Sequence, residues 1–161
     1  LQMPVQGCGG LRASFGAFVR EEKLSGANRY NTRRPELGRQ EARRGARLHS
    51  VPPVLQLHLK RFEYDAQSGE MRKLQQAFRF PTSLRLQRFM SSAPAPPSYK
   101  LLAVLSHVGH FGSGHYVSYV RPVGRTQWFK FDDTRVSAVA EHVAVRGQFG
   151  GRDSPRPHAR F

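Results

Sequence analysis

His115 and Asp132 are the residues of this chain whose types and spacing most directly indicate chemistry. They lie at the outer ends of two segments with strand character, because residues 115–120 are β-branched and aromatic and residues 127–131 are mostly aromatic. Residues 122–125 contain a proline and a glycine and predict a turn between the segments. A hairpin centred on the middle of that turn puts His115 opposite Asp132, with Cβ atoms roughly 5 Å apart. The carboxylate can then accept the imidazole Nδ1–H, which leaves Nε2 free to take a proton.

Two interpretations of this pair are open. A histidine beside an aspartate in a hairpin is more often a surface pair than a catalytic one, and a slip of one residue in register would put the two side chains on opposite faces. The residues just before His115 favour catalysis, because three glycines there can bring backbone close to a ligand. These glycines are Gly109, Gly112 and Gly114, and two histidines flank them, His107 and His110.

The charge of the chain suggests a second class of function. The net charge is +15 over 161 residues, which predicts attraction to polyanions, nucleic acid included. Residues 30–47 are polar and rich in arginine, and the run lacks the interleaved aromatic residues that stack on bases. A solvated face explains such a run equally well, so nucleic acid is a partner that the sequence allows and does not favour.

Length and composition limit the class of protein further. A chain of 161 residues predicts one domain with a buried core. It contains no run of 18 apolar residues, so we expect no membrane span and no membrane partner. A single cysteine, Cys8, excludes an internal disulfide and fits a reducing compartment.

Four further segments are predicted to support the hairpin. Residues 54–62 alternate between leucine and polar residues and predict a half-buried strand. Residues 99–107 are largely apolar and predict a strand buried on both faces that leads into the histidine loop. Residues 11–23 predict a short amphipathic helix, and residues 137–145 predict a helix with Ser137 as its N-cap.

Two separated motifs resemble those of the ubiquitin-specific proteases. Residues 114–119, GHYVSY, followed by WFKFDD at residues 128–133, resemble the histidine box of that family. Residues 51–62, VPPVLQLHLKRF, resemble a strand that precedes the box in the family, and the likeness runs from about Phe15 to Gly151. The resemblance implies an α+β fold: the palm and fingers part of a papain-like cysteine protease, an antiparallel sheet with a few short helices, without the thumb that carries the nucleophile.

The resemblance also implies an activity and a set of site residues. The reaction would be hydrolysis of ubiquitin isopeptide bonds by a deubiquitinating thiol protease, with His115 as general base and then acid, and Asp132 orienting it. Ubiquitin and ubiquitinated proteins would be the partners, in the nucleus or cytoplasm, and no cofactor is needed. Many relatives hold a structural zinc through paired CxxC motifs; these are missing here, so we predict no metal. The implied substrate-binding residues are Phe62, Tyr64, His107, Gly114 and Tyr116.

The chain departs from the family in having no nucleophile box. In the family the catalytic cysteine lies far upstream, beside an asparagine, whereas Cys8 lies between two glycines and is predicted to be an inert thiol. We therefore expect residues 1–151 to be the C-terminal portion of a catalytic domain and residues 152–161 a basic, disordered tail. Alone, the chain would be an inactive fragment of a longer protease or a degenerate form. The alternatives are a non-catalytic ubiquitin-binding protein and a basic nucleic-acid-binding protein.

Overall fold

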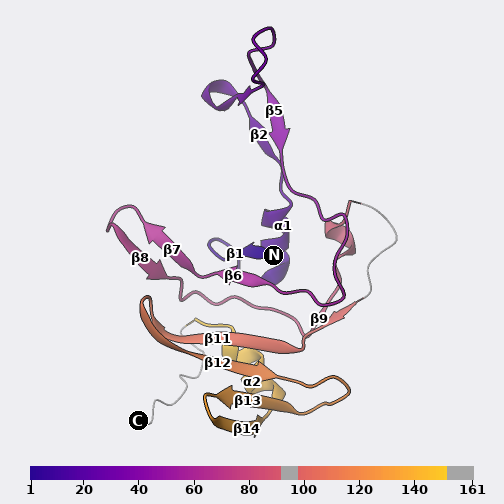
Figure 1. Ribbon diagram of the computed structural model, residues 1–161, viewed down its shortest axis with the longest axis vertical. Coiled ribbons are helices and arrows are strands. Elements are labelled where there is room, and N and C mark those ends of the chain that lie inside the picture. Colours follow the sequence, from indigo (N-terminus) through magenta and orange to yellow (C-terminus); the bar gives the residue numbers. More distant parts are fainter. Residues whose placement is uncertain (92–97, 152–161) are drawn as a thin grey trace.

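The computed structural model of the chain describes residues 1–91 and 98–151, and Figure 1 shows how their elements are arranged. The tail predicted at residues 152–161 lies outside the described residues. No helix of the described part is long and apolar enough to cross a membrane. Two hydrophobic core clusters divide the described residues into two layers of packing.

The first cluster belongs to a four-stranded antiparallel sheet in the order β11-β12-β13-β14. Valine, tyrosine and tryptophan side chains on one face of this sheet pack against the helical turns that follow it: Val117, Tyr119 and Trp128 against Ala144 and Val145. The elements are β11 (Ala103–His110), β12 (Ser113–Val120), β13 (Trp128–Asp132), β14 (Arg135–Val139), α2 (Glu141–Ala144) and the 3₁₀ helix η3 (Arg146–Gln148).

The second cluster surrounds helix α1 (Leu11–Phe18), which presents Leu11, Ser14 and Phe15 to the core. The helix starts after Gly10, where a Cβ would lie 2.5 Å from the Arg79 carbonyl oxygen, so only glycine fits. Three strand pairs and a 3₁₀ helix surround it. The pairs are β1 (Gln2–Pro4) with β6 (His58–Lys60), β7 (Phe62–Asp65) with β8 (Glu70–Lys73), and β9 (Ser83–Leu84) with β10 (Tyr99–Lys100), and the 3₁₀ helix is η2 (Gln87–Phe89).

An arm of small strands projects from this second layer (Figure 1). It contains β2 (Glu22–Leu24) paired with β5 (Ala42–Arg44), the 3₁₀ helix η1 (Gly26–Asn28), and β3 (Tyr30–Asn31) paired with β4 (Arg39–Gln40). Ion pairs on its surface neutralise part of the arginine run: Arg47 with Glu21 at 2.8 Å and Arg44 with Glu22 at 3.0 Å. Apart from the buried Leu24, most of the arm is exposed.

A large groove of about 1840 Å³ separates the two layers. One wall is the outer edge of β11, which has no strand on that side in the described sheet, and the other wall includes residues 53–59. Aromatic contacts join the layers, with Phe80 and Phe149 at 4.9 Å between ring centroids and Phe62 and His107 at 5.4 Å. The sheet with its histidines is therefore held to the rest of the molecule by a few specific contacts.

Four predicted elements differ from the observed ones. The helix expected at 11–23 ends at Phe18, and residues 22–24 form β2 instead. The strand expected at 54–62 is interrupted, since only His58–Lys60 and Phe62–Asp65 form ladders, although its alternation of exposed and half-buried residues is present. The strand expected at 99–107 is not buried on both faces, because Leu105 is 69% exposed towards the groove. Residues 135–139 form β14, so the helix predicted from Ser137 starts only at Glu141, with Ala140 as its N-cap.

Candidate active site

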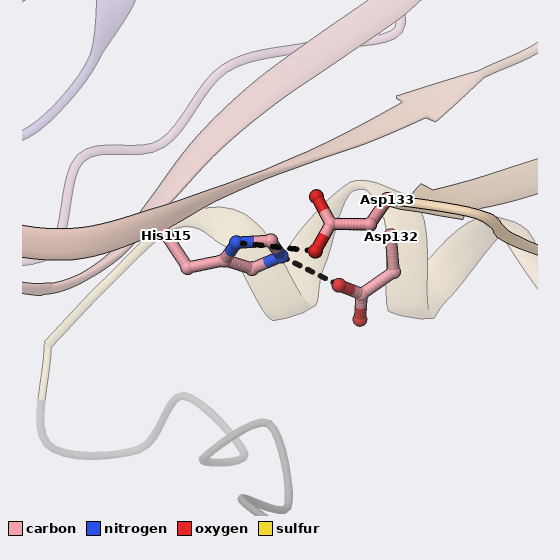
Figure 2. A group of neighbouring side chains, drawn as sticks. All are labelled: His115, Asp132 and Asp133. Carbon is pink, nitrogen blue, oxygen red and sulfur yellow. Dashed lines mark hydrogen bonds and ion pairs between the residues drawn. The ribbon is translucent and has the colours of Figure 1, made fainter.

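The structure brings His115 and Asp132 together on the face of the sheet that packs against α2. The imidazole Nε2 lies 2.6 Å from the Asp132 Oδ1. Figure 2 shows the two side chains pointing toward each other, with a dashed line between them. The side chains are 43% and 32% exposed, so the pair is partly accessible to a ligand. A neutral imidazole in contact with a carboxylate donates to it, because a carboxylate can only accept. Nε2 therefore carries the proton, and Nδ1 holds the free lone pair.

This geometry corrects two details of the sequence-based prediction. The register of β12 and β13 pairs Ser118 with Phe131, so His115 lies diagonally from Asp132 and not directly opposite. The displacement is by two residues, which keeps both side chains on one face and within reach of each other. The nitrogen that contacts Asp132 is Nε2 and not Nδ1, so the nitrogen left free for proton transfer is Nδ1.

Asp133 and Lys130 complete the charged surroundings of the imidazole. The Asp133 Oδ2 lies 4.0 Å from Nδ1, beyond hydrogen-bond distance, on a side chain that is 79% exposed. Lys130, two residues before Asp132 on the same strand face, donates to the Asp132 Oδ2 at 2.6 Å. This hydrogen bond, followed by the one to His115, lowers the pKa of Asp132 below its usual value. Asp132 is thereby kept ionised and anchored at both oxygens.

The opposite face of the same strands carries most of the predicted substrate-binding residues. His107 pairs across the ladder with Tyr116, and their rings lie 4.9 Å apart. Phe62 reaches His107 from β7, and Phe111 at the tip of the β11–β12 hairpin lies 5.7 Å from Phe62. Gly114 lies under the His107 ring, where a Cβ would be 2.2 Å from the imidazole Nε2. These residues cluster, and their role in binding stays a prediction.

Tyr64 and Cys8 lie apart from these residues. Tyr64 is 65% exposed and lines a separate shallow pocket, whereas Phe62, His107 and Tyr116 line the large groove. Cys8 is 6% exposed and belongs to the core cluster around α1, not to the cluster beneath His115. Its position is that of a buried structural thiol, and its inertness stays a prediction.

His115, Asp132 and Asp133 also form a candidate metal site, since each offers one ligand atom and these atoms lie within 4.8 Å of one another. An imidazole and two carboxylates are ligands that divalent cations accept. The Lys130 ammonium already occupies the second oxygen of Asp132, which opposes a further cation there. The arrangement fits orientation of a neutral imidazole better than it fits a metal centre.

Sequence reasoning missed Lys130 and Lys73. Lys130 could have been found, because strand alternation puts residues 130 and 132 on one face. Lys73 donates to His107 and Gly109 across 34 and 36 residues of sequence, and no local pattern predicts such a contact.

Comparisons with known proteins match this chain to a family. The family described as ubiquitin carboxyl-terminal hydrolase matches residues 9–155. Ubiquitin C-terminal hydrolase 13 of Arabidopsis thaliana is 39% identical over 160 residues, which is 95% of this chain and 14% of the relative. Ubiquitin carboxyl-terminal hydrolase 7 of Drosophila melanogaster is 36% identical over 154 residues, 95% of this chain and 14% of the relative. The chain thus spans about a seventh of the length of these curated relatives.

Solved structures give the same result. The Ubp8 deubiquitinating module of SAGA bound to ubiquitin aldehyde matches with a TM-score of 0.78 and 29% identity, over 92% of this chain and 34% of that one. A yeast SAGA deubiquitinating module with a mutant Sgf73 matches with a TM-score of 0.76 and 31% identity, over 92% and 32%. The fold of the described residues, sheets with a few short helices, is consistent with part of such a catalytic domain.

Proposed function

The chain belongs to the ubiquitin carboxyl-terminal hydrolase family, and from this premise we propose that it is the part of a deubiquitinating thiol protease that supplies the base and its orienting carboxylate. The observation that carries the proposal is the 2.6 Å contact between the His115 Nε2 and Asp132 Oδ1. A general base needs a free lone pair on a ring held in one orientation, and this contact provides both.

The proposed mechanism starts at the free Nδ1 of His115. A cysteine thiol from the thumb of the parent protease gives its proton to Nδ1, and the thiolate attacks the carbonyl carbon of the isopeptide bond. The imidazolium, stabilised by the ionised Asp132, then returns the proton to the leaving lysine amine. Water, deprotonated by the same nitrogen, hydrolyses the thioester and releases the ubiquitin carboxylate. Asp132 acts through His115 and stays ionised throughout.

Ubiquitin would approach through the face that carries His107 and Tyr116. Because His115 points to the other face of β12, the C-terminal tail has to cross the sheet at its hairpin end. Gly112 lies there with nothing within 4 Å of its Cβ position, which leaves room for a narrow Gly-Gly segment, and Gly114 follows it beneath the His107 ring. A structural neighbour was solved with ubiquitin aldehyde, which supports a ubiquitin-binding role for this part of the fold.

Several finer assignments are part of the proposal. Residues 1–151 would be the palm and fingers of a papain-like domain, with the arm of β2–β5 as the fingers and the thumb supplied elsewhere in the parent. Among members of the family, the herpesvirus-associated ubiquitin-specific protease would be the nearest, and the compartment would be the nucleus or cytoplasm. No cofactor or metal takes part, and Tyr64 would contact ubiquitin outside the groove.

A chimaera tests the proposal. Replacing the matching stretch of the Arabidopsis relative with residues 9–151 of this chain restores a thumb, and the chimaera should release rhodamine from ubiquitin-rhodamine. The unmodified relative is the positive control. A folded chimaera that binds ubiquitin and cannot cleave it would contradict the proposal.

The isolated chain provides the complementary test. Without a thumb it should bind ubiquitin and show no turnover, and ubiquitin lacking its C-terminal Gly-Gly should bind more weakly. Robust turnover by the isolated chain that Cys8→Ala abolishes would show that Cys8 is the nucleophile and overturn this assignment.

A further inference from the structure

Lys73 makes more hydrogen bonds to the histidine hairpin than any residue that the sequence singled out. From the end of β8 its Nζ lies 2.7 Å from the His107 carbonyl oxygen, 2.9 Å from the Gly109 carbonyl oxygen and 3.1 Å from the His107 Nδ1. Residues 107 and 109 point their carbonyls to the same side of β11, the outer edge that no described strand covers. One ammonium thus caps the exposed edge of the strand just before the hairpin.

The number of donors on Lys73 fixes the protonation state of His107. An ammonium group has three N–H donors and no lone pair, and here it has three partners. Since two of these partners are carbonyl oxygens, which can only accept, the third donor points to Nδ1, and Nδ1 must be unprotonated. The ring is then the neutral Nε2–H tautomer.

The remaining N–H of His107 is directed at the place where a ligand would pass. Nε2 lies over Gly114, where even a methyl group would clash with it, and within the described residues it has no hydrogen-bond acceptor. The rings of Phe62 and Tyr116 contact the imidazole edge to face, with centroids 5.4 and 4.9 Å away. A hydrogen-bond donor fixed in this way suits a backbone carbonyl of an extended chain that runs beside Gly114.

We propose that Lys73 is a positioning residue, which locks His107 as an Nε2–H donor and presents it to a carbonyl oxygen in the C-terminal tail of ubiquitin. The identity of the ligand rests on the function proposed above, and the role of Lys73 in fixing the ring does not. The pairing is a bridge between the two layers, because Lys73 belongs to β8 and His107 to the four-stranded sheet.

The electrostatics around the ring agree with this assignment. Burial and then the Lys73 charge lower the pKa of His107, which keeps the ring neutral. Burial and then Arg61 lower the pKa of Lys73 from a value far above neutrality. The groups facing His107 are thus Lys73 and the aromatic rings of Phe62 and Tyr116, and no carboxylate of the described residues pairs with it.

The tautomer can be measured directly on the 161-residue chain. Long-range ¹H–¹⁵N correlation spectra should show His107 with a protonated Nε2 and an unprotonated Nδ1. Lys73→Met should abolish this single state and give a mixture. Lys60→Met, which removes an exposed lysine outside the groove, should leave it intact. A wild-type ring protonated at Nδ1, or an unchanged ring in Lys73→Met, would overturn the proposal.

A second variant covers the case in which Lys73→Met does not fold. The Lys73→Gln side chain can still donate to a strand carbonyl and also offers an acceptor oxygen to Nδ1–H. It should fold and shift His107 towards the opposite tautomer, and an unchanged tautomer there would equally contradict the role of Lys73.

Ubiquitin binding gives the second readout. Lys73→Gln and His107→Ala should each weaken ubiquitin binding about fivefold, the usual size for one hydrogen bond, whereas Lys60→Met should not. If the wild-type chain does not bind ubiquitin, the proposed function fails while the spectra still decide the role of Lys73. If His107→Ala weakens binding and Lys73→Gln changes the tautomer without weakening it, the presentation step is wrong.

Discussion

His115 and His107 stand on neighbouring strands of one sheet, on opposite faces, and the difference between them lies in their partners. Asp132 accepts from Nε2 of His115, so the free nitrogen is an acceptor that can take a proton. Lys73 donates to Nδ1 of His107, so the free nitrogen is a donor. Both rings are therefore the same tautomer with opposite capacities. We propose that this difference suits the two rings to different roles. The anionic partner of His115 suits it to act as a base, and the cationic partner of His107 suits it to bind an acceptor.

Removing the proposed base, His115, should have the largest effect of all the substitutions on kcat. In the chimaera, His115→Ala should lower kcat by on the order of 10⁴-fold or more, because the thiol then loses its proposed proton acceptor. Ubiquitin affinity of the isolated chain should hardly change, since His115 points away from the binding face. His107→Ala should show the reverse pattern, with a raised KM. Equal losses of kcat in both variants would remove the functional distinction between the two faces.

Changing Asp132 while His115 stays in place should have the next largest effect on kcat. Asp132→Asn keeps the shape of the side chain and loses the charge that fixes the tautomer and stabilises the imidazolium. We expect kcat of the chimaera to fall roughly 10²- to 10⁴-fold with little change in KM. The pH profile of kcat should also change, which loss of folded protein alone would not produce. A profile identical to that of the parent chimaera would argue against an orienting role.

Gly114→Ala should affect the binding face while the base remains. A Cβ at this position meets the His107 ring and lies 2.6 Å from the Val108 carbonyl oxygen, so the hairpin has to shift. Overpacking of this kind costs about 1–3 kcal/mol, and we expect a lower melting temperature and weaker ubiquitin binding. Gly112→Ala is a less crowded comparison, since no atom lies near its Cβ position, although its positive φ of 76° adds strain. Full binding by Gly114→Ala would show that the His107 ring need not lie where it does.

The sequence alone predicts that His115 and Asp132 meet, although it gives the wrong register. The pairing of His115 with Asp132 was predicted by a turn at residues 122–125, and Arg125 does donate to the Pro122 carbonyl there at 3.0 Å. Two further residues, Thr126 and Gln127, precede β13 and shift its register by two. A register shift by an even number of residues leaves every side chain on the same face. His115 and Asp132 therefore lie in contact although the predicted register was wrong.

Contacts across the groove could not be predicted in this way. Lys73 and His107 come from strands that are far apart in the sequence, and which ring nitrogen a partner reaches depends on side-chain rotamers rather than on alternation. The helix predicted from Ser137 was wrong for a related reason. Residues 135–139 have a weak helix propensity. They pair with the edge of β13, and a propensity scale does not account for the hydrogen bonds of that pairing.

The smallest effect should come from changing Lys130, which acts on His115 only through its hydrogen bond to Asp132. Its hydrogen bond is the largest cause of the lowered pKa of Asp132, so Lys130→Met should raise that pKa towards the usual value of 3.8. A carboxylate with a lowered pKa stabilises the fold above its usual pKa, and the contribution is lost as the pH falls through the lowered value. The variant should therefore lose the His115–Asp132 contact at a higher pH during acid titration, as followed by the Asp132 ¹³Cγ resonance. An unchanged midpoint of the Asp132 titration would mean that His115 alone keeps Asp132 ionised. The environments of the two histidines would then differ only in the charge of one partner each, Asp132 for His115 and Lys73 for His107.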